Sequence, residues 1–510
     1  MDCRMDSTTT RIEDLVLARA DTSPDAVALR RHGDTISFSA LRARARGLAA
    51  MLETEGATKA PVGVLTHTSI DTVVAMLGCL IAGVPYVPID PGLPAARRDV
   101  ILSDAGVELV VHDEEVDLRG LIDRDVTLLA STSASPSTAC VVAEERSPIA
   151  SILYTSGSTG VPKGVVVLHE NVVPFMRWAE RVIALDHDDV VLCQSPLHFD
   201  MHIVDLFVAL AAGASVVLVD RATTLFPRAV FEALAANRVT FVLGVPSSLI
   251  GLLRVPALGA AGLPALRTIA YGGEEFPVAQ LRALAALVPH ARIINMYGPV
   301  ETNAVTALVV TREHLELARV PIGRPAESTS IILIDDDGAI IDQPEVEGEI
   351  AVHGPSVSPG YLNDPELTRA SRAVVDHGGT RTEYYRTGDY GHRDVEGLLH
   401  FRGRRDQRVK TRGYRVELGD LEATLERHGA VELAVVVPVP HEEHTNVLHA
   451  FVTPSAEELI TGDELLRWLR SAVPSFMLPR RLDVRPSMPR TASGKIDRQA
   501  LLSEAANQGS

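Results

Sequence analysis

Apolar runs and longer periodic stretches alternate along most of the chain. Residues 62–65, 239–245 and 266–271 are short, mainly apolar stretches bounded by turn-forming residues, which is typical of buried strands. Residues 70–82 are mostly apolar over a length that predicts a buried helix, and Gly83 marks its end. This alternation predicts a sheet of mainly parallel strands connected by helices.

The alternation is most regular between residues 214 and 295. Strands are expected at 214–219, 239–245, 266–271 and 291–295, with helices at 229–237 and 278–288. In sheets of this kind, ligands bind in the loops at the carboxyl ends of the strands. The polar sequences GGEE and MYGPVET follow two of these strands, so both are candidates for a binding site.

Before residue 150 the sequence predicts a tail, two amphipathic helices, a strand pair and a long polar stretch. Residues 1–12 are expected to form a tail, and amphipathic helices are expected around 12–20 and 39–52 on either side of a strand pair. Residues 113–145 are mostly polar and are expected to form a surface excursion before the next strand.

The sequence changes character near residue 400. The stretch FRGRRDQRVKTRGYR contains seven basic residues, namely Arg402, Arg404, Arg405, Arg408, Lys410, Arg412 and Arg415. Beyond it we expect a helix at 418–428, strands at 431–437 and 448–452, and a helix at 463–472. We therefore predict a large α/β domain over residues 1–403 and a smaller, mobile α+β domain over residues 404–510.

The stretch LYTSGSTGVPKGV, residues 153–165, lies between two apolar runs and predicts a strand, a flexible loop and a second strand. Glycines allow backbone N–H groups to approach an anion, hydroxyls donate further hydrogen bonds, and Lys163 supplies a positive charge. The loop is not a Walker A sequence, because Lys163 stands between Pro162 and Gly164 rather than before Ser or Thr. The pattern indicates a polyphosphate-binding loop.

Composition narrows the function classes. With 46% hydrophobic and 22% charged residues the chain has the composition of a soluble globular protein, and its net charge of −18 argues against general nucleic-acid binding. No stretch approaches the ~20 apolar residues of a membrane span, and no secretory signal is evident, so a cytoplasmic location is expected. The cysteines are far apart in sequence and predict neither disulfides nor a metal site: Cys3, Cys79, Cys140 and Cys193.

Further motifs follow the loop in a fixed order. These are HFD (198–200), NMYGPVET (295–302), GEIAVHGPSVSPGYL (348–362), YRTGD (385–389), GRRDQRVKTRGYRVELGDLE (403–422) and TASGKIDR (491–498), with GVPYVPID (83–90) before it. Over nearly its whole length the chain resembles adenylate-forming enzymes, the superfamily of acyl-CoA synthetases, luciferases and nonribosomal peptide synthetase adenylation domains. It is most similar to the amino-acid-activating adenylation domains.

The resemblance implies where ATP and Mg²⁺ bind. The implied nucleotide contacts are Thr155, Ser156, Gly157, Ser158, Thr159, Gly160, Lys163, Gly272, Gly273, Glu274, Asn295, Met296, Tyr297, Gly298, Asp389 and Arg404. Tyr297 would stack on the adenine and Asp389 would accept hydrogen bonds from the ribose hydroxyls. Glu301 and Thr159 are the implied Mg²⁺ ligands, with Thr155 as an alternative hydroxyl. The family motif has Thr or Ala where this chain has Val300, so no role is assigned to Val300.

The resemblance also implies a two-step mechanism. Lys495 would bridge the substrate carboxylate and the α-phosphate, and the catalytic set is completed by Glu301, Thr155 and His198. Asp406 stands at the hinge about which the small domain would turn between the two half-reactions. Gly413 would then face the active site in the second state.

Asp200 is the residue that indicates the substrate class. In the amino-acid-activating branch an aspartate here pairs with the substrate ammonium, whereas a carboxylic acid without an amino group would leave it unpaired. The alternative is an aspartate that caps the following helix. The implied pocket lining is apolar or small, which favours a small to medium apolar amino acid, α or β: Met201, Val204, Leu243, Ala270, Gly272, Met296, Ala304 and Val305.

The expected acceptor is a separate acyl or peptidyl carrier protein bearing phosphopantetheine, because no carrier domain is recognised in the sequence. The implied role is in natural-product biosynthesis. Two alternatives remain open at this point: a CoA ligase for a small carboxylic acid, and a non-catalytic nucleotide-binding scaffold. No nucleic acid or membrane partner is expected.

Overall fold

The computed structural model describes most of the chain, and every structural statement below concerns these residues. The described ranges are 10–57, 60–118, 121–122, 126–138, 146–155, 161–255, 262–377, 379–404, 408–411, 414–441, 446–455, 460–490 and 496–508.

The largest sheet runs through the N-terminal part of the molecule. Within the described residues it has nine strands in the order β15-β14-β13-β12-β11-β9-β10-β1-β2. These are β1 (Val27–Arg31), β2 (Asp34–Ser37), β9 (Val190–Cys193), β10 (Ser215–Leu218), β11 (Phe241–Gly244), β12 (Thr268–Gly272), β13 (Arg292–Tyr297), β14 (Thr306–Val309) and β15 (Arg324–Pro325). The strands from β13 to β1 are parallel, as the alternation of strand and helix predicts.

A second sheet lies beside the first, and its described strands have the order β6-β5-β3-β4-β7-β8. They are β3 (Val62–Leu65), β4 (Tyr86–Ile89), β5 (Leu109–His112), β6 (Thr127–Ala130), β7 (Ile149–Thr155) and β8 (Lys163–Leu168). Strand β6 falls inside the polar stretch expected to be a surface excursion, and it pairs parallel with β5. The prediction of an excursion is corrected here: the strand is only four residues long and lies at the edge of the sheet, so it does not stand out from the polar residues around it.

Helices cover both sheets of the N-terminal part. They are α1 (Ile12–Leu17), α2 (Arg19–Thr22), α3 (Phe38–Thr54), α4 (Ile70–Ala82), α5 (Ala95–Asp104), α6 (His169–Ile183), α7 (Ala209–Ala212), α8 (Arg221–Thr224), α9 (Pro227–Ala236), α10 (Pro246–Leu252) and α12 (Val278–Leu287). Helix α4 has the predicted bounds, and Gly83 ends it with φ +74°. A π-helical turn, Ile203–Val208, directly precedes α7. Short 3-10 turns are η1 (Ser131–Ser133) and η3 (His314–Glu316).

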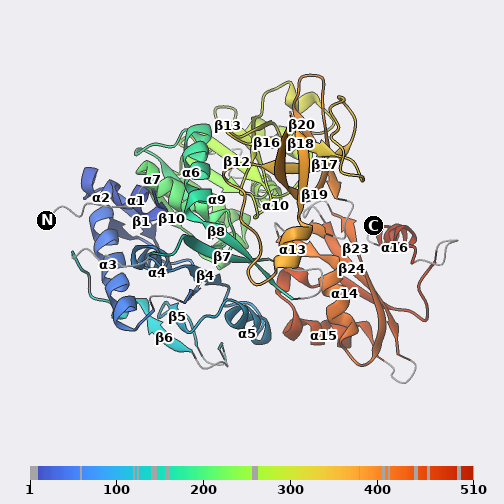
Figure 1. Ribbon diagram of the computed structural model, residues 1–510, viewed down its shortest axis with the longest axis horizontal. Coiled ribbons are helices and arrows are strands. Elements are labelled where there is room, and N and C mark those ends of the chain that lie inside the picture. The colour runs from blue at the N-terminus through green and yellow to red at the C-terminus, as the bar shows by residue number, and fades with distance from the viewer. Residues whose placement is uncertain are drawn as a thin grey trace.

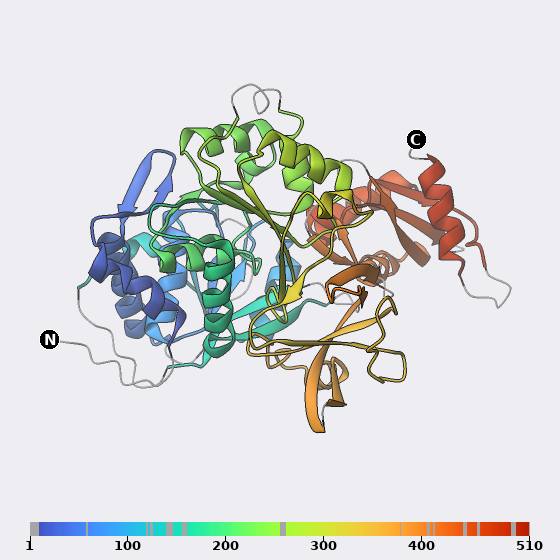
Figure 2. The ribbon, with the colours of Figure 1, turned by 90° about the horizontal axis from the view of Figure 1, so that it is seen from above.

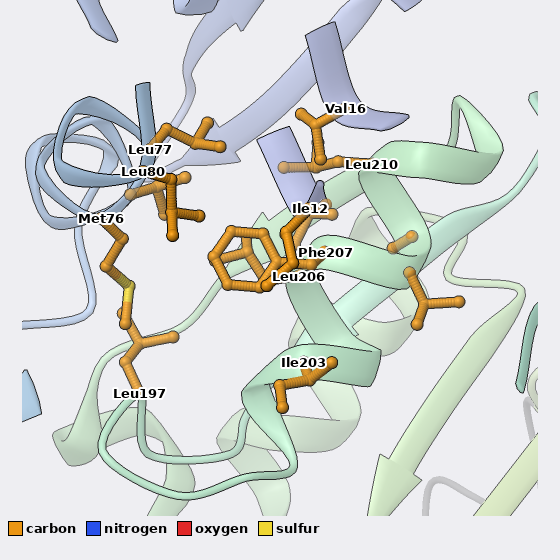
Figure 3. Close-up of a cluster of buried hydrophobic side chains, with 14 of the residues drawn as sticks. Ile12, Val16, Met76, Leu77, Leu80, Leu197, Ile203, Leu206, Phe207 and Leu210 are labelled. Carbon is orange, nitrogen blue, oxygen red and sulfur yellow. The ribbon is translucent and has the colours of Figure 1, made fainter. Parts of the chain in front are cut away.

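The main hydrophobic core lies where these helices pack between the two sheets. Figure 3 shows Ile12 and Val16 of α1, Met76 of α4, Phe207 of the π-helical turn and Leu210 of α7 pointing toward one another. Each of these side chains is at most 2% exposed. Burial on this scale stabilises the fold by about 1.5–3 kcal/mol for each large side chain. This rigid core fixes the loops that carry the site.

A third sheet follows in the sequence and is antiparallel. Its described strands are β16 (Ser330–Ile334), β17 (Gly348–His353), β18 (Arg372–His377), β19 (Thr380–Arg393) and β20 (Leu399–Arg404), with helix α13 (Pro365–Ala370) before β18. The alternation of strands and helices does not extend into this region, and no strands or helices were predicted for it.

The C-terminal part has its own hydrophobic core. Its elements are β21 (Arg408–Thr411), β22 (Tyr414–Glu417), α14 (Leu418–Glu426), β23 (Val431–Pro440), β24 (Asn446–Pro454), α15 (Gly462–Ala472), η4 (Ser475–Met477), β25 (Arg481–Val484) and α16 (Arg498–Gln508). The buried clusters here contain described residues from 409 onward only. The predicted α/β class with a smaller C-terminal domain is thus confirmed, while the boundary at residues 403 and 404 stays a prediction.

The two parts lie at opposite ends of the molecule. Figures 1 and 2 place the blue N-terminal helices far from the red C-terminal elements, with the antiparallel sheet beside the junction. Among the described residues, no helix combines the length and apolarity needed to cross a bilayer.

Candidate active site

A cleft of about 630 Å³ lies between the N-terminal sheets and the C-terminal part. Its N-terminal walls come from the ends of β7, β12 and β13 and from the loop after β9. On the other side it is closed by Val409, Tyr414, Leu418 and Phe476. The carboxyl ends of parallel strands therefore meet at this cleft, as expected for an α/β ligand site.

The ends of the predicted polyphosphate-binding loop lie at this cleft, which Thr155 and Pro162 line. Strands β7 and β8 pair antiparallel, with Thr155 opposite Lys163. Thr155 lines the cleft, and its Oγ1 is buried without a hydrogen-bond partner among the described residues. Such a hydroxyl fits a phosphate or a Mg²⁺ ion. The predicted contacts Ser156, Gly157, Ser158, Thr159 and Gly160 lie outside the described residues.

Lys163 contacts the C-terminal part in this structure. Its Nζ donates to Oε1 of Glu417 at 2.9 Å, and the two side chains are only 10% and 2% exposed. Nζ also lies 5.4 Å from the ring centre of Tyr361. The charge predicted to bind phosphate is therefore neutralised here by a carboxylate at the end of β22.

Glu301, the predicted Mg²⁺ ligand, is 2% exposed in the loop after β13. Its Oε1 accepts a hydrogen bond from the Tyr361 hydroxyl at 2.8 Å. Carboxylate and hydroxyl oxygens are the ligands that Mg²⁺ prefers. Glu301 and Thr155 each offer an oxygen of the kind that this ion prefers.

Tyr297 and Asp389 are brought together from different sheets. Tyr297 is 6% exposed, and its hydroxyl donates to Oδ2 of Asp389 at 2.7 Å. Burial raises the pKa of Tyr297 well above its ordinary value, and the adjacent carboxylate raises it further. Asp389 also forms an ion pair with Arg404, its partner across β19 and β20. The predicted ribose and nucleotide contacts thus form one hydrogen-bonded group.

Three glycines at the carboxyl ends of β12 and β13 line the cleft: Gly272, Gly273 and Gly298. A Cβ on Gly272 would lie 2.6 Å from the Met296 carbonyl oxygen, and one on Gly298 would lie 1.8 Å from the carbonyl oxygen of Asn303. Gly273 has φ +85°, which a residue with a side chain rarely adopts. Backbone therefore forms this wall of the cleft.

Of two other predicted nucleotide contacts, Glu274 lies at the cleft and Asn295 does not. Glu274 lines the cleft, and its Oε2 accepts the backbone N–H of Ser247 at 3.2 Å. Asn295 instead is buried and donates from its side chain to the carbonyl of Pro321 at 2.9 Å. Its side chain holds the neighbouring loop and does not line the cleft.

Most of the predicted substrate pocket is assembled. Asp200 lines the cleft together with Met201, Val204, Leu243, Gly272, Met296 and Ala304. Ala270 and Val305 are fully buried and are not among the lining residues. Ala270 lies on the same face of β12 as Gly272 but one pleat further from the strand end. Val305 packs in the cluster that contains Tyr297 and Ile322.

Two acidic residues near Asp200 were missed by the sequence reasoning. Asp205 lies in the π-helical turn and is 0% exposed, and its Oδ2 accepts the Ser195 N–H at 3.3 Å. Burial raises the pKa of Asp205 to about 7. Asp90 accepts the Gly92 N–H at 2.8 Å, and its Oδ2 lies 3.9 Å from Nε2 of His198, which lines the cleft. Asp90 is the last residue of the GVPYVPID motif, so this motif could have indicated Asp90 as a candidate site residue.

Aromatic side chains join the two parts across the cleft. The rings of Phe199 and Tyr414 meet edge to face at 5.0 Å, and Tyr414 stacks on Phe476 at 3.9 Å. Arg97 of α5 adds an ion pair of 2.9 Å to Asp420 of α14, which is 0% exposed. The predicted hinge Asp406, Gly413 and the predicted catalytic Lys495 lie outside the described residues.

Comparisons with known proteins agree with this geometry. Residues 16–362 match the family described as AMP-binding enzyme, and residues 420–495 match the AMP-binding enzyme C-terminal domain. The chain is 32% identical over 499 residues to a D-alanine–D-alanyl carrier protein ligase of Bacillus cytotoxicus, covering 95% of this chain and 97% of the relative.

Two solved structures show the same fold. One is holo-PA1221, described as an NRPS protein containing adenylation and PCP domains, with a TM-score of 0.86 and 26% identity over 97% of this chain and 84% of that chain. The other is IdnL1, with a TM-score of 0.81 and 29% identity over 94% of this chain and 99% of that chain.

Proposed function

The chain belongs to the AMP-binding enzymes and is an adenylate-forming ligase, and we propose that it transfers a small apolar amino acid to the phosphopantetheine thiol of a carrier protein. The amino acid carboxylate would attack the α-phosphate of ATP, giving aminoacyl-AMP and pyrophosphate. The thiol would then displace AMP to form a thioester. The names of the relatives, which ligate D-alanine to a carrier protein, support this acceptor.

The observation that carries the proposal is the position of Asp200 in the cleft. Asp200 lines it beside Met201 and Val204, on the same wall as Leu243 and Met296. An ammonium group bound here would form an ion pair with this partly buried carboxylate. A deaminated acid of the same size would not, so an amino acid is the favoured substrate class.

The apolar lining and the relatives together favour a substrate of about the size of alanine. Met201 and Met296 extend into the lining and can adapt to small differences in shape. Either an α- or a β-amino group could reach Asp200. A role in natural-product biosynthesis remains part of the proposal.

For the nucleotide, we propose that Tyr297 flanks the adenine and that Asp389 binds the ribose. Thr155 would contact phosphate, and Glu301 would hold Mg²⁺, which when bound would neutralise charge on the triphosphate. The buried Thr155 hydroxyl and the buried Glu301 carboxylate support these assignments. The Tyr297 hydroxyl and Arg404 contact Asp389 in this structure, so both would shift when ribose binds.

ATP–pyrophosphate exchange tests the substrate class. Glycine, D- and L-alanine, β-alanine, valine and leucine should be compared with propionate as the deaminated control. Exchange should be fastest with a small amino acid, and faster exchange with propionate would overturn the assignment. The product should then be offered to a holo D-alanyl carrier protein and to CoA. Loading of CoA alone would favour the small-acid CoA ligase.

The arrangement of the C-terminal part favours the thioester-forming state. Val409 and Tyr414 line the cleft, and Glu417 pairs with Lys163, which the first half-reaction would use for phosphate. One lysine cannot serve both partners at once. We therefore propose that pyrophosphate release allows Lys163 to pair with Glu417 and the small domain to adopt this orientation.

Glu417→Gln should slow thioester transfer by about 10–100-fold while leaving pyrophosphate exchange nearly unchanged, since removing one member of a poorly exposed ion pair leaves the other uncompensated. The KM for ATP should not rise, because the variant lacks the Glu417 carboxylate that competes with phosphate for Lys163. Both half-reactions should be measured on one preparation.

Glu504→Gln is the matched control, because Glu504 pairs with Arg485 wholly inside the C-terminal part. It should leave both half-reactions unchanged. A Glu417→Gln variant that loads thiol at the wild-type rate would show that the ion pair does not stabilise the transfer state.

A further inference from the structure

Three charged or titratable side chains from separate segments meet at one edge of the cleft. They are Asp90 after β4, His198 after β9 and Arg221 at the start of α8. Nε2 of His198 lies 3.9 Å from Oδ2 of Asp90, and Nη1 of Arg221 lies 3.8 Å from that same oxygen. The side chains of His198 and Asp90 are only 19% and 11% exposed.

The resemblance includes His198 in the catalytic set without giving it a step. Asp90 has no role in the nucleotide or ammonium contacts described above. Asp90 is fixed by the Gly92 N–H at 2.8 Å, so its carboxylate has a defined orientation toward His198. A Cβ on Gly92 would lie 2.8 Å from Arg221 Nη1 and 3.1 Å from Asp90 Oδ1, so Gly92 lies directly beside this pair.

His198 borders the path between the two parts of the molecule. Its ring lies 4.8 Å from that of Phe199, which meets Tyr414 at 5.0 Å, and Tyr414 stacks on Phe476. Arg221 donates to the Ser475 hydroxyl at 3.1 Å, next to Phe476 in the chain. His198 therefore lies where the cleft is closed by the C-terminal part, in the orientation that we assign to thioester formation.

Resting on the proposed function, we infer that His198 is the general base that deprotonates the incoming pantetheine thiol, and that Asp90 is its positioning residue. With the proton of the neutral imidazole on Nε2 directed at Asp90, Nδ1 accepts the proton of the S–H group. The sulfur forms a bond to the acyl carbon, the bond from that carbon to the phosphate oxygen breaks, and AMP leaves with the electron pair. The imidazolium then releases its proton to solvent.

The charge state of His198 agrees with this role. Burial lowers the pKa of His198 below its ordinary value, so the imidazole is neutral and can accept a proton at pH 7. Asp90 raises this pKa and Arg221 lowers it, so the two neighbours act in opposite directions. The other titratable groups that face the cluster are Tyr414 of β22 and His202.

His202 is excluded as the base by its contacts. It is 0% exposed, its Nε2 lies 2.8 Å from the Tyr86 hydroxyl, and its Nδ1 contacts the carbonyl of Phe199. Both ring nitrogens are thus engaged inside the core. Burial lowers the pKa of His202 to about 4, and it is not among the residues that line the cleft.

The test measures the two half-reactions separately. Transfer to pantetheine is followed from the preformed adenylate of the amino acid that gives the fastest pyrophosphate exchange. His198→Ala should slow this transfer by about 10²–10³-fold at pH 7, the usual contribution of a general base, while exchange is much less affected. The deficit should shrink as the pH approaches the thiol pKa of about 8.5, where the thiol ionises unaided.

Two conservative variants test the neighbours through the pH profile of transfer. Asp90→Asn removes the group that raises the pKa of His198, so the acidic limb should move to lower pH and the maximum rate should fall. Arg221→Met removes the group that lowers it, so the acidic limb should move to higher pH. Arg228→Met, which changes an exposed arginine on α9 paired with Glu232, is the control and should leave the profile unchanged.

A His198→Ala variant with an equal loss in both half-reactions, or with a deficit independent of pH, would overturn the inference. So would profiles that move in the same direction in Asp90→Asn and Arg221→Met. Wild-type protein that forms the adenylate but transfers it to no thiol would instead overturn the proposed function, and the inference with it.

Discussion

Lys495→Ala should reduce ATP–pyrophosphate exchange by about 10²–10³-fold, the cost of removing one preorganised charge from a developing negative centre. Its ammonium would bring the substrate carboxylate and the α-phosphate together against their mutual repulsion. The second half-reaction has no such repulsion, so transfer of supplied aminoacyl-AMP to a thiol should be retained. Lys495 lies outside the described residues, and the expectation rests on the sequence TASGKIDR.

The two half-reactions should be assayed on the same preparation of Lys495→Ala. Arg481→Ala, which removes an exposed cation of β25, is a suitable control and should change neither rate. Normal exchange in the Lys495 variant would exclude its role in adenylation. Equal loss of both half-reactions would indicate a folding defect, which the far-UV spectrum and the thermal transition would reveal.

Asp200→Ala should lower kcat/KM for the amino acid by about 10²–10³-fold, because the substrate ammonium would be desolvated without its counter-charge. The effect should be specific to the amino group. The variant should therefore lose most or all of its preference for alanine over propionate, while its KM for ATP changes little. Exchange assays with both acids measure this preference directly.

Asp200→Asn and Asp188→Ala complete the comparison. The amide keeps the shape of the side chain but not its charge, so it should resemble the alanine variant in its loss of preference. Asp188 is an exposed carboxylate of the preceding loop, with a side chain 87% exposed, and its removal should have no effect. An Asp200→Ala variant that still prefers alanine would exclude the ammonium contact.

Local sequence patterns predicted most of the secondary structure correctly. Helix α4 was expected at residues 70–82, and α12 and β11 differ from expectation by only one or two residues at an end. Helix α4 and strand β11 are buried along nearly their whole length, so mainly apolar stretches of helix and strand length mark them in the sequence. Strand β6 was missed because an edge strand carries little of that signal.

The motifs indicated residues but not all of their surroundings. Thr155, Glu301, Asp389 and Asp200 were chosen from sequence, and the structure places all four at one cleft or, for Glu301, in the loop beside it. The partners of these residues were not predictable. Tyr361 holds Glu301 from 60 positions away, and Tyr297 reaches Asp389 over 92 positions.

The sequence by itself determined the fold class, the family and the chemical kinds of side chain available, because hydrophobic period and motif order are properties of neighbouring residues. Only the tertiary structure decided that Asn295 turns away from the cleft, that Ala270 and Val305 are buried behind it, and that Lys163 pairs with Glu417, 254 positions along the chain. Such contacts depend on how sheets twist and on how the C-terminal part packs against the N-terminal part. Their energies come from burial and charge pairing between distant segments, and neither has a signature in the local order of residues.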